Sequence, residues 1–272
     1  MHPFETTIVS LLDQGEEPTV THFGGVSALL SEASAISSSM LMPEFLKGAL
    51  AALRQSSDSE KDDLTEFVCR CIEGATDDFV LMEAVDCLDK YRPLPSEADR
   101  RCFARFIAIA SDRAANPMSK SVALDGAFRW AVSERVRQLQ LLTLLLQISN
   151  EEEPIFLARA AKIMGVAYSH WREADLLKRL KELVQIEGVG DEAAFEIAMA
   201  SLTDGLEAET RERAIAAFDS ARYWFEISTE RREHNPTASA YACCLEMLAS
   251  FSGIGGSSLA RFSRRDRKER TP

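Results

Sequence analysis

Apolar residues recur every three or four positions along nearly the whole chain, and almost no segment alternates apolar and polar residues as strands do. Residues 77–91 are typical, because apolar residues recur there at helical spacing, namely Phe79, Val80, Met82, Val85 and Leu88. The pattern therefore predicts an all-α fold.

The same spacing, with the helix-breaking residues between the stripes, predicts about a dozen helices joined by short turns. Because short connections force consecutive helices into antiparallel pairs, either one compact helical domain or an α-solenoid of stacked hairpins is possible. We favour the solenoid, since residues 133–148 carry leucines around much of the circumference, as in a helix sandwiched between neighbours. The expected helices are 42–55, 59–73, 77–91, 96–113, 118–131, 134–148, 153–170, 172–187, 191–203, 210–232 and 236–251, with a shorter one inside the Ser-rich residues 21–39.

The second series of expected helices follows Asn116-Pro117. One helix start in this series has a strong local signal. Asn150, followed by three acidic residues and Pro154, supplies a capping side chain, negative charge at the positive end of the helix dipole, and a proline at the first helical position.

One stretch, Ala194–Ala221, resembles a tetratricopeptide repeat, a helix-turn-helix unit with small residues where its two helices touch. The resemblance implies a helical-repeat fold, and the earlier hairpins are similar to the HEAT-like class. The matching positions are Ile197 and Ala198 in the first helix, Gly205 at the turn, and Ala214, Phe218 and Ala221 in the second helix.

The formal net charge of -12 is confined to the N-terminal third, where residues 1–100 contain 19 acidic and 7 basic residues. This third is a poor candidate for binding nucleic acid or anionic membranes; its acids serve either solubility or docking of a basic partner. The chain is therefore divided into an acidic N-terminal helical region (1–115), a C-terminal helical-repeat region (116–252) and a flexible basic tail (253–272).

No segment has the length and apolar character of a membrane span, and the N-terminus lacks the basic region of a signal peptide. These observations predict a cytoplasmic protein without membrane contact. The cysteines are then expected to be reduced and largely buried. They are Cys69, Cys71, Cys87, Cys102, Cys243 and Cys244.

Candidate chemistry is sparse. Cys69 and Cys71 are two residues apart, so on a helix they point in different directions and cannot chelate a metal together. The four histidines, His2, His22, His170 and His234, are far apart in sequence, and no nucleophile elbow, zinc-protease or phosphate-loop motif occurs. We therefore predict no catalytic, cofactor-binding or metal-binding residues. The paired acids are expected to complement dipoles in the first turns of helices.

The turn at Gly188, Val189 and Gly190 resembles the helix-hairpin-helix motif, which binds DNA backbone through main-chain amides. Glu187, Asp191 and Glu192 surround it and would repel phosphate, so a plain interhelical turn is the favoured interpretation.

The tail contains the only concentrated positive charge of the sequence. Its basic residues are either solvated or bind a partner, which is either acidic, such as the chain's own N-terminal third, or nucleic acid. They are Arg261, Arg264, Arg265, Arg267, Lys268 and Arg270.

Together these patterns predict a non-enzymatic helical scaffold or adaptor that binds protein partners in a multi-subunit assembly. The alternatives are a nucleic-acid-associated protein that uses the basic tail and the 188–190 turn, and a helical enzyme whose site is assembled from distant residues.

Overall fold

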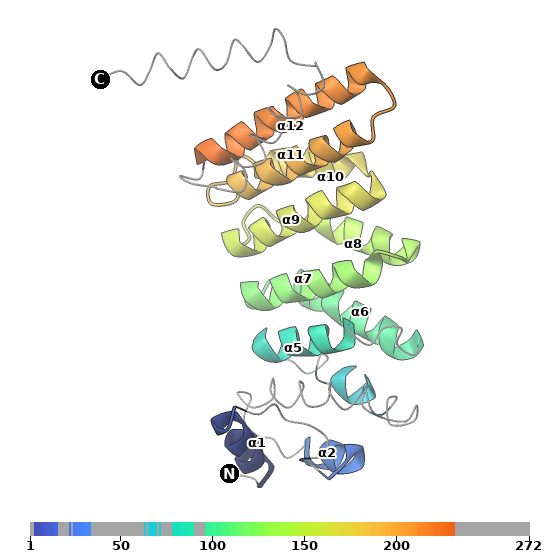
Figure 1. The fold of residues 1–272 in the computed structure, drawn as a ribbon, viewed down its shortest axis with the longest axis vertical. Coiled ribbons are helices and arrows are strands. Elements are labelled where there is room, and N and C mark those ends of the chain that lie inside the picture. Colours follow the sequence, from blue (N-terminus) through green and yellow to red (C-terminus); the bar gives the residue numbers. More distant parts are fainter. Residues whose placement is uncertain are drawn as a thin grey trace, which may run out of the picture. The chain divides into compact units, whose positions relative to one another are not determined.

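A computed structural model of the chain confirms the all-α prediction for the part that it describes. Every regular element there is a helix (Figure 1). The described residues are 3–15, 22, 24–33, 63, 65–69, 71, 78–89 and 96–231.

Several predicted segments lie outside the described residues, namely the helices at 42–55 and 236–251 and the basic tail 253–272. A helix at the N-terminus, α1, was not predicted. The labelled helices are α1 (Pro3–Asp13), α2 (Val26–Ala33), α5 (Asp78–Asp89), α6 (Ser96–Ser111), α7 (Pro117–Ala131), α8 (Arg135–Gln147), α9 (Pro154–Trp171), α10 (Ala174–Leu183), α11 (Gly190–Leu206) and α12 (Arg211–Arg231). The helices from α5 to α12 begin and end within three residues of the predicted bounds, except that α10 ends at Leu183 and not at residue 187.

The contacts divide the chain into two compact units, unit 1 (Met1–Leu144) and unit 2 (Leu145–Pro272), with the boundary inside α8. The division at residues 115 and 116 that charge and helix order indicate stays a prediction. Each unit is described by itself.

In unit 1, α7 packs against both α5 and α6. Helix α7 starts at Pro117, one residue before the predicted range of 118–131. Asn116 is its N-cap residue, because its Oδ1 accepts a hydrogen bond of 2.8 Å from the amide of Met118 and Pro117 follows the cap. Trp130 of α7 is fully buried and meets Phe106 of α6 edge to face, with ring centroids 5.3 Å apart. This pair is the centre of the α6–α7 core.

A buried arginine joins α6 to the start of α8. The Arg137 guanidinium contacts Asp99 at 2.5 Å and Glu134 at 2.7 Å, and it lies 5.2 Å from the centre of the Phe103 ring. Its side chain is only 8% exposed, so the two carboxylates compensate a charge that would otherwise be costly to bury.

The prediction of buried thiols is confirmed for two cysteines of unit 1. Cys69 and Cys102 are completely buried, the Cys102 thiol donates a hydrogen bond of 3.2 Å to the Sγ of Cys69, and neither forms a disulfide. Cys71 is half-buried, and side chains of the other cysteines lie outside the described residues.

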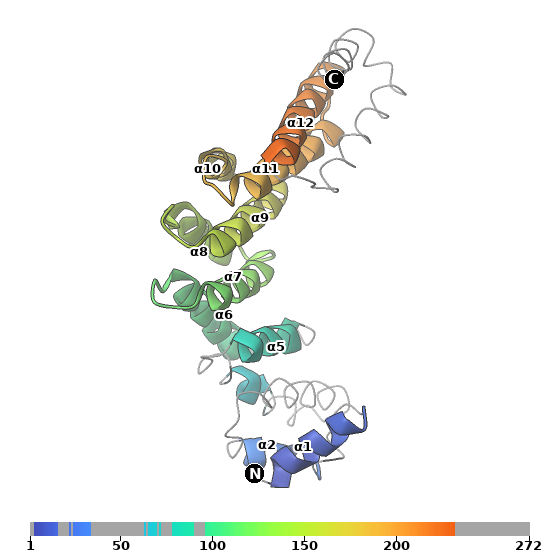
Figure 2. The ribbon, with the colours of Figure 1, turned by 90° about the vertical axis from the view of Figure 1, so that its left-hand side faces the viewer.

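In unit 2, α9, α10 and α11 all contact one another, and α12 packs along α11. The contacts between α9 and α11 follow the same order along both helices: Gly165 meets Glu196, and further on Arg172 meets Asp204. These helices therefore run in the same direction, and α10 lies to one side of them (Figure 2). Along α11 and α12 the order reverses: Ser201 meets Ser220, and Phe195 meets Phe225. These helices therefore form an antiparallel hairpin.

The α11–α12 hairpin buries Ala198, Ala221 and Phe225 in one cluster. Gly205 does not lie at the turn, as the tetratricopeptide resemblance implied, because α11 continues to Leu206. A Cβ atom at residue 205 would lie 2.5 Å from the Phe218 ring, so glycine here admits the aromatic side chain of the opposite helix. The resemblance to a tetratricopeptide stays a prediction.

The predicted capping role of Asn150 is wrong. Glu153 is the N-cap residue of α9, and no side chain caps the helix. Asn150 Oδ1 instead accepts a hydrogen bond of 2.6 Å from the Arg179 guanidinium of α10, which also donates to the Ile148 carbonyl at 2.7 Å. A partner 29 residues away thus takes the side chain that local sequence assigned to the helix start.

Among the described residues, no helix combines the length and the apolar character that crossing a bilayer requires.

Candidate functional site

The Gly-Val-Gly turn connects α10 to α11, and each of its residues has a packing role. Gly188 has a φ of +75°, a conformation that side chains with a Cβ rarely adopt. Val189 is completely buried. At residue 190 a Cβ would collide with the carbonyl oxygen of Val184 and lie 2.5 Å from Nη1 of Arg231, so only glycine fits.

Two main-chain amides of this turn are already engaged. The N–H groups of Val189 and Gly190 both donate to the Ile186 carbonyl, with N–O distances of 3.3 Å and 2.9 Å. Since these two hydrogens are used within the turn, they are not available to a phosphate oxygen. The geometry supports the interpretation of Gly188, Val189 and Gly190 as an interhelical turn.

A pocket of about 460 Å³ opens beside the turn. Three acidic residues, Glu187, Asp191 and Glu192, line it together with Arg231, whose Nη1 donates to the Val184 carbonyl. Asp191 and Glu192 lie in the first turn of α11, where the helix dipole favours negative charge, as predicted for the paired acids. The pocket therefore has an acidic rim, which opposes phosphate.

We expect Gly190→Ala to lower the free energy of unfolding of unit 2 by about 1–3 kcal/mol, because the added methyl group must displace the Val184 carbonyl or the Arg231 side chain. Urea denaturation of the variant and of the wild type measures the difference. A Gly190→Ala protein as stable as the wild type would contradict this account of the turn.

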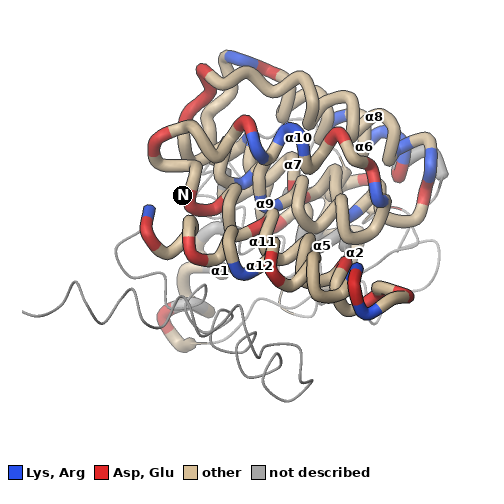
Figure 3. The backbone as a smooth tube through the Cα atoms, turned by 90° about the horizontal axis from the view of Figure 1, so that it is seen from above, with Lys and Arg blue, Asp and Glu red and all other residues tan. Residues whose placement is uncertain are grey.

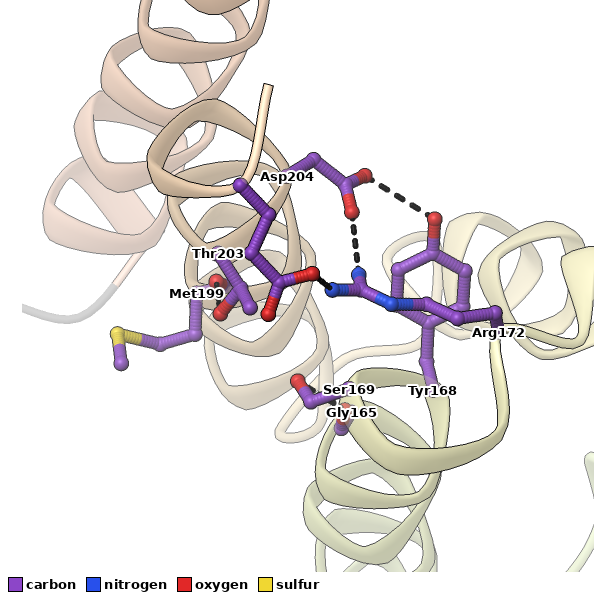
Figure 4. Close-up of polar contacts among 8 residues, drawn as sticks. Gly165, Tyr168, Ser169, Arg172, Met199, Thr203 and Asp204 are labelled. Atoms are coloured by element: carbon purple, nitrogen blue, oxygen red, sulfur yellow. Dashed lines mark hydrogen bonds and ion pairs between the residues drawn. The ribbon is translucent and has the colours of Figure 1, made fainter. Parts of the chain in front are cut away.

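A polar seam runs along the contact between α9 and α11. At its C-terminal end Arg172, the only described non-glycine residue with positive φ, binds the carboxylates of Asp204 and Glu207 (Figure 4). The Tyr168 hydroxyl donates to Asp204 at 3.0 Å. Burial, followed by the hydrogen bond to Asp204, raises the pKa of Tyr168. This cluster fastens the ends of the two helices to each other.

Further along the same seam lies Glu196, a glutamate of α11 that is only 5% exposed. It packs over Gly165 of α9, where a Cβ would lie 2.7 Å from the Glu196 Cβ. Burial, and then the negative charge of Glu192, raise the pKa of Glu196 to about 8, while Lys162 lowers it. Among the described residues no Lys or Arg forms an ion pair with it, so Glu196 is largely neutral at pH 7.

Sequence reasoning missed Glu196, although a signal was present. Glu192 and Glu196 are four residues apart, so they share one face of α11, and Ile197 and Ala198 place the apolar stripe beside that face. What the sequence could not supply is the glycine of α9 that makes room for the carboxyl group.

The other predicted sites contribute no further chemistry to the described part. Acidic and basic positions are interspersed on its helices (Figure 3), and no three His, Cys, Asp or Glu side chains there are grouped as metal ligands would be. His170 lies in the last turn of α9, as expected for a helix end. The tail residues Arg261, Arg264, Arg265, Arg267, Lys268 and Arg270 lie outside the described residues, as do His234, Cys243 and Cys244.

One exposed surface also departs from expectation. Val136 and Leu139 of α8 are 62% and 47% exposed, and Val132, in the turn before α8, is 39% exposed. Arg137 and Leu141 are buried on the opposite side of the helix. The prediction of a helix covered around its circumference is therefore wrong for this side of α8, which we call the α8 apolar face (Val132, Val136 and Leu139).

Comparisons with known proteins yield no relative: no family model matches the chain, and neither the curated proteins nor the solved structures contain a match. In its described part the chain is thus defined by its fold as an all-α protein.

Proposed function

We propose that this protein is a cytoplasmic, non-enzymatic scaffold or adaptor, built as an α-solenoid of helical hairpins, that binds protein partners within a larger assembly. The observation that carries the proposal is the α8 apolar face. Two apolar residues of α8 and one in the turn before it are exposed to solvent, while the other side of the helix is packed. Exposed apolar surface of this kind is typical of protein interaction sites.

The hairpins of unit 2 support the helical-repeat part of the proposal. Helices α9 and α11 run in the same direction with α10 beside them, and α12 returns along α11. In solenoids such units stack and expose extended surfaces for partner domains or peptides.

The proposal predicts that the double variant Val136→Ser and Leu139→Ser loses its partner while keeping its fold. The lost contacts lie on an exposed surface, so the free energy of unfolding changes by no more than about 0.5 kcal/mol per site. The measurement is co-purification of the tagged full chain from its native source at moderate salt, followed by size-exclusion chromatography and mass spectrometry of a stoichiometric complex.

Leu206→Ser is the matched control, because Leu206 is equally apolar, 68% exposed and located on α11. We expect it to retain the partner. Recovery of the wild-type chain as a lone monomer would contradict the scaffold. A complex with nucleic acid that weakens steeply with salt and depends on residues 257–272 would favour the alternative function instead.

A further inference from the structure

We propose that the α9–α11 seam is a proton-controlled joint, in which the Glu196 carboxyl group packs between the two helices while it is neutral and its ionisation opens them. The proposal concerns unit 2 and does not depend on the scaffold function. It explains a buried acid that has no role in the hairpin core.

The closed state is defined by the space above Gly165. Because Gly165 has no side chain, the Glu196 side chain fits between α9 and α11, and the residue is only 5% exposed to water. A neutral carboxyl group tolerates such a site. A carboxylate does not, because moving an unpaired charge out of water costs several kcal/mol.

The charged groups near Glu196 set the direction of opening. Glu192, one turn earlier on α11, repels the carboxylate, whereas Lys162 of α9 attracts it. Lys162 is exposed, so a carboxylate that pairs with it must leave the seam for the solvent side. From α10 and α12, the other helices packed against α11, no described residue acts electrostatically on Glu196.

The Arg172 cluster limits how far the joint opens. Arg172, Asp204 and Glu207 form charge pairs at the C-terminal ends of both helices, and these pairs do not require the proton of Glu196. Opening is therefore expected to begin at the N-terminal halves of α9 and α11, close to the acid-rimmed pocket.

Hydrogen exchange of the full chain tests the joint, with rates corrected for the intrinsic pH dependence of amide exchange. If opening exposes Glu196 to water, linkage predicts that the protection of α9 and α11 falls by about 30-fold between about pH 6.5 and about pH 9.5. In Glu196→Gln this fall should be absent. Helices α6 and α7 of unit 1 provide the internal reference.

Two further variants separate the joint from a merely structural role. Lys162→Met removes the attraction and should shift the midpoint of opening to higher pH, while Glu192→Gln removes the repulsion and should shift it to lower pH. Equal pH responses of wild type and Glu196→Gln would overturn the proposal. So would unchanged protection of α9 and α11 in the wild type across the same range.

Discussion

Replacing Phe225 with alanine is expected to lower the free energy of unfolding of unit 2 by about 3–5 kcal/mol. Phe225 is completely buried in the α11–α12 hairpin, in one cluster with Ala198 and Ala221. Its ring meets that of Phe195 edge to face at 5.7 Å, so the substitution removes both buried area and an aromatic pair. The small neighbouring alanines cannot fill the cavity.

Tyr223→Ala is the matched control, because it deletes an aromatic ring from the same helix at a position that is 57% exposed. We expect a change of no more than about 1 kcal/mol, since little buried area is lost. Urea denaturation followed by circular dichroism measures both variants, and an unchanged slope with denaturant would show that only stability has altered. Equal losses in the two variants would show that the hairpin core is not centred on Phe225.

Local signals in the sequence were sufficient for the helices themselves. The helix predicted after Asn116-Pro117 is α7, and its cap and first-turn proline depend on residues that are neighbours in the chain. The short helix expected within residues 21–39 is α2, and the range predicted for α12 differs from the observed bounds by one residue at each end. Periodicity is a local property, so it survives without knowledge of the tertiary fold.

Features that depend on distant partners were not predictable in the same way. Asn150 has the sequence of a cap but binds Arg179, which is 29 residues away. Gly205 has the sequence of a turn residue but lies within α11, because Phe218 occupies the space that a Cβ would take. In both cases a tertiary contact overrides a local preference, and one sequence alone does not reveal which distant residue arrives.

The residues of the candidate site also divide into those that local sequence predicts and those that depend on distant partners. The acids around Gly188, Val189 and Gly190 argue against phosphate from the sequence alone, and the engaged amides of Val189 and Gly190 support that argument. Burial of Glu196 depends on Gly165, in a helix that is not adjacent to α11 in sequence order. The seam could therefore be found only once α9 and α11 were known to be neighbours.

Glu196→Gln is expected to stabilise unit 2 by about 3 kcal/mol at pH 7, and the gain should depend on pH. In the unfolded chain Glu196 has its ordinary pKa of 4.5, whereas in the folded chain the pKa is about 8. At pH 7 folding must therefore return a proton to a group that is ionised when unfolded. Glutamine has nearly the same shape and requires no such proton.

The pH range of the gain follows from the two pKa values of Glu196. Below 4.5 the carboxyl group is neutral in both states, so the wild type carries no penalty. As the pH rises from 4.5 to about 8 the wild type loses stability relative to the variant, and above that the difference is constant. Urea titrations of both proteins at several pH values measure this difference, in which the titrations of all other groups cancel.

Glu192→Gln is the control, because Glu192 lies one turn away on the same face but lines the pocket and is only partly buried. It should leave most of the pH dependence in place, since Glu196 still titrates between the two states. A Glu196→Gln protein whose stability runs parallel to that of the wild type from about pH 4 to about pH 9 would mean that Glu196 is ionised in the folded chain. The space above Gly165 would then hold a solvated carboxylate, and the seam would be open at neutral pH.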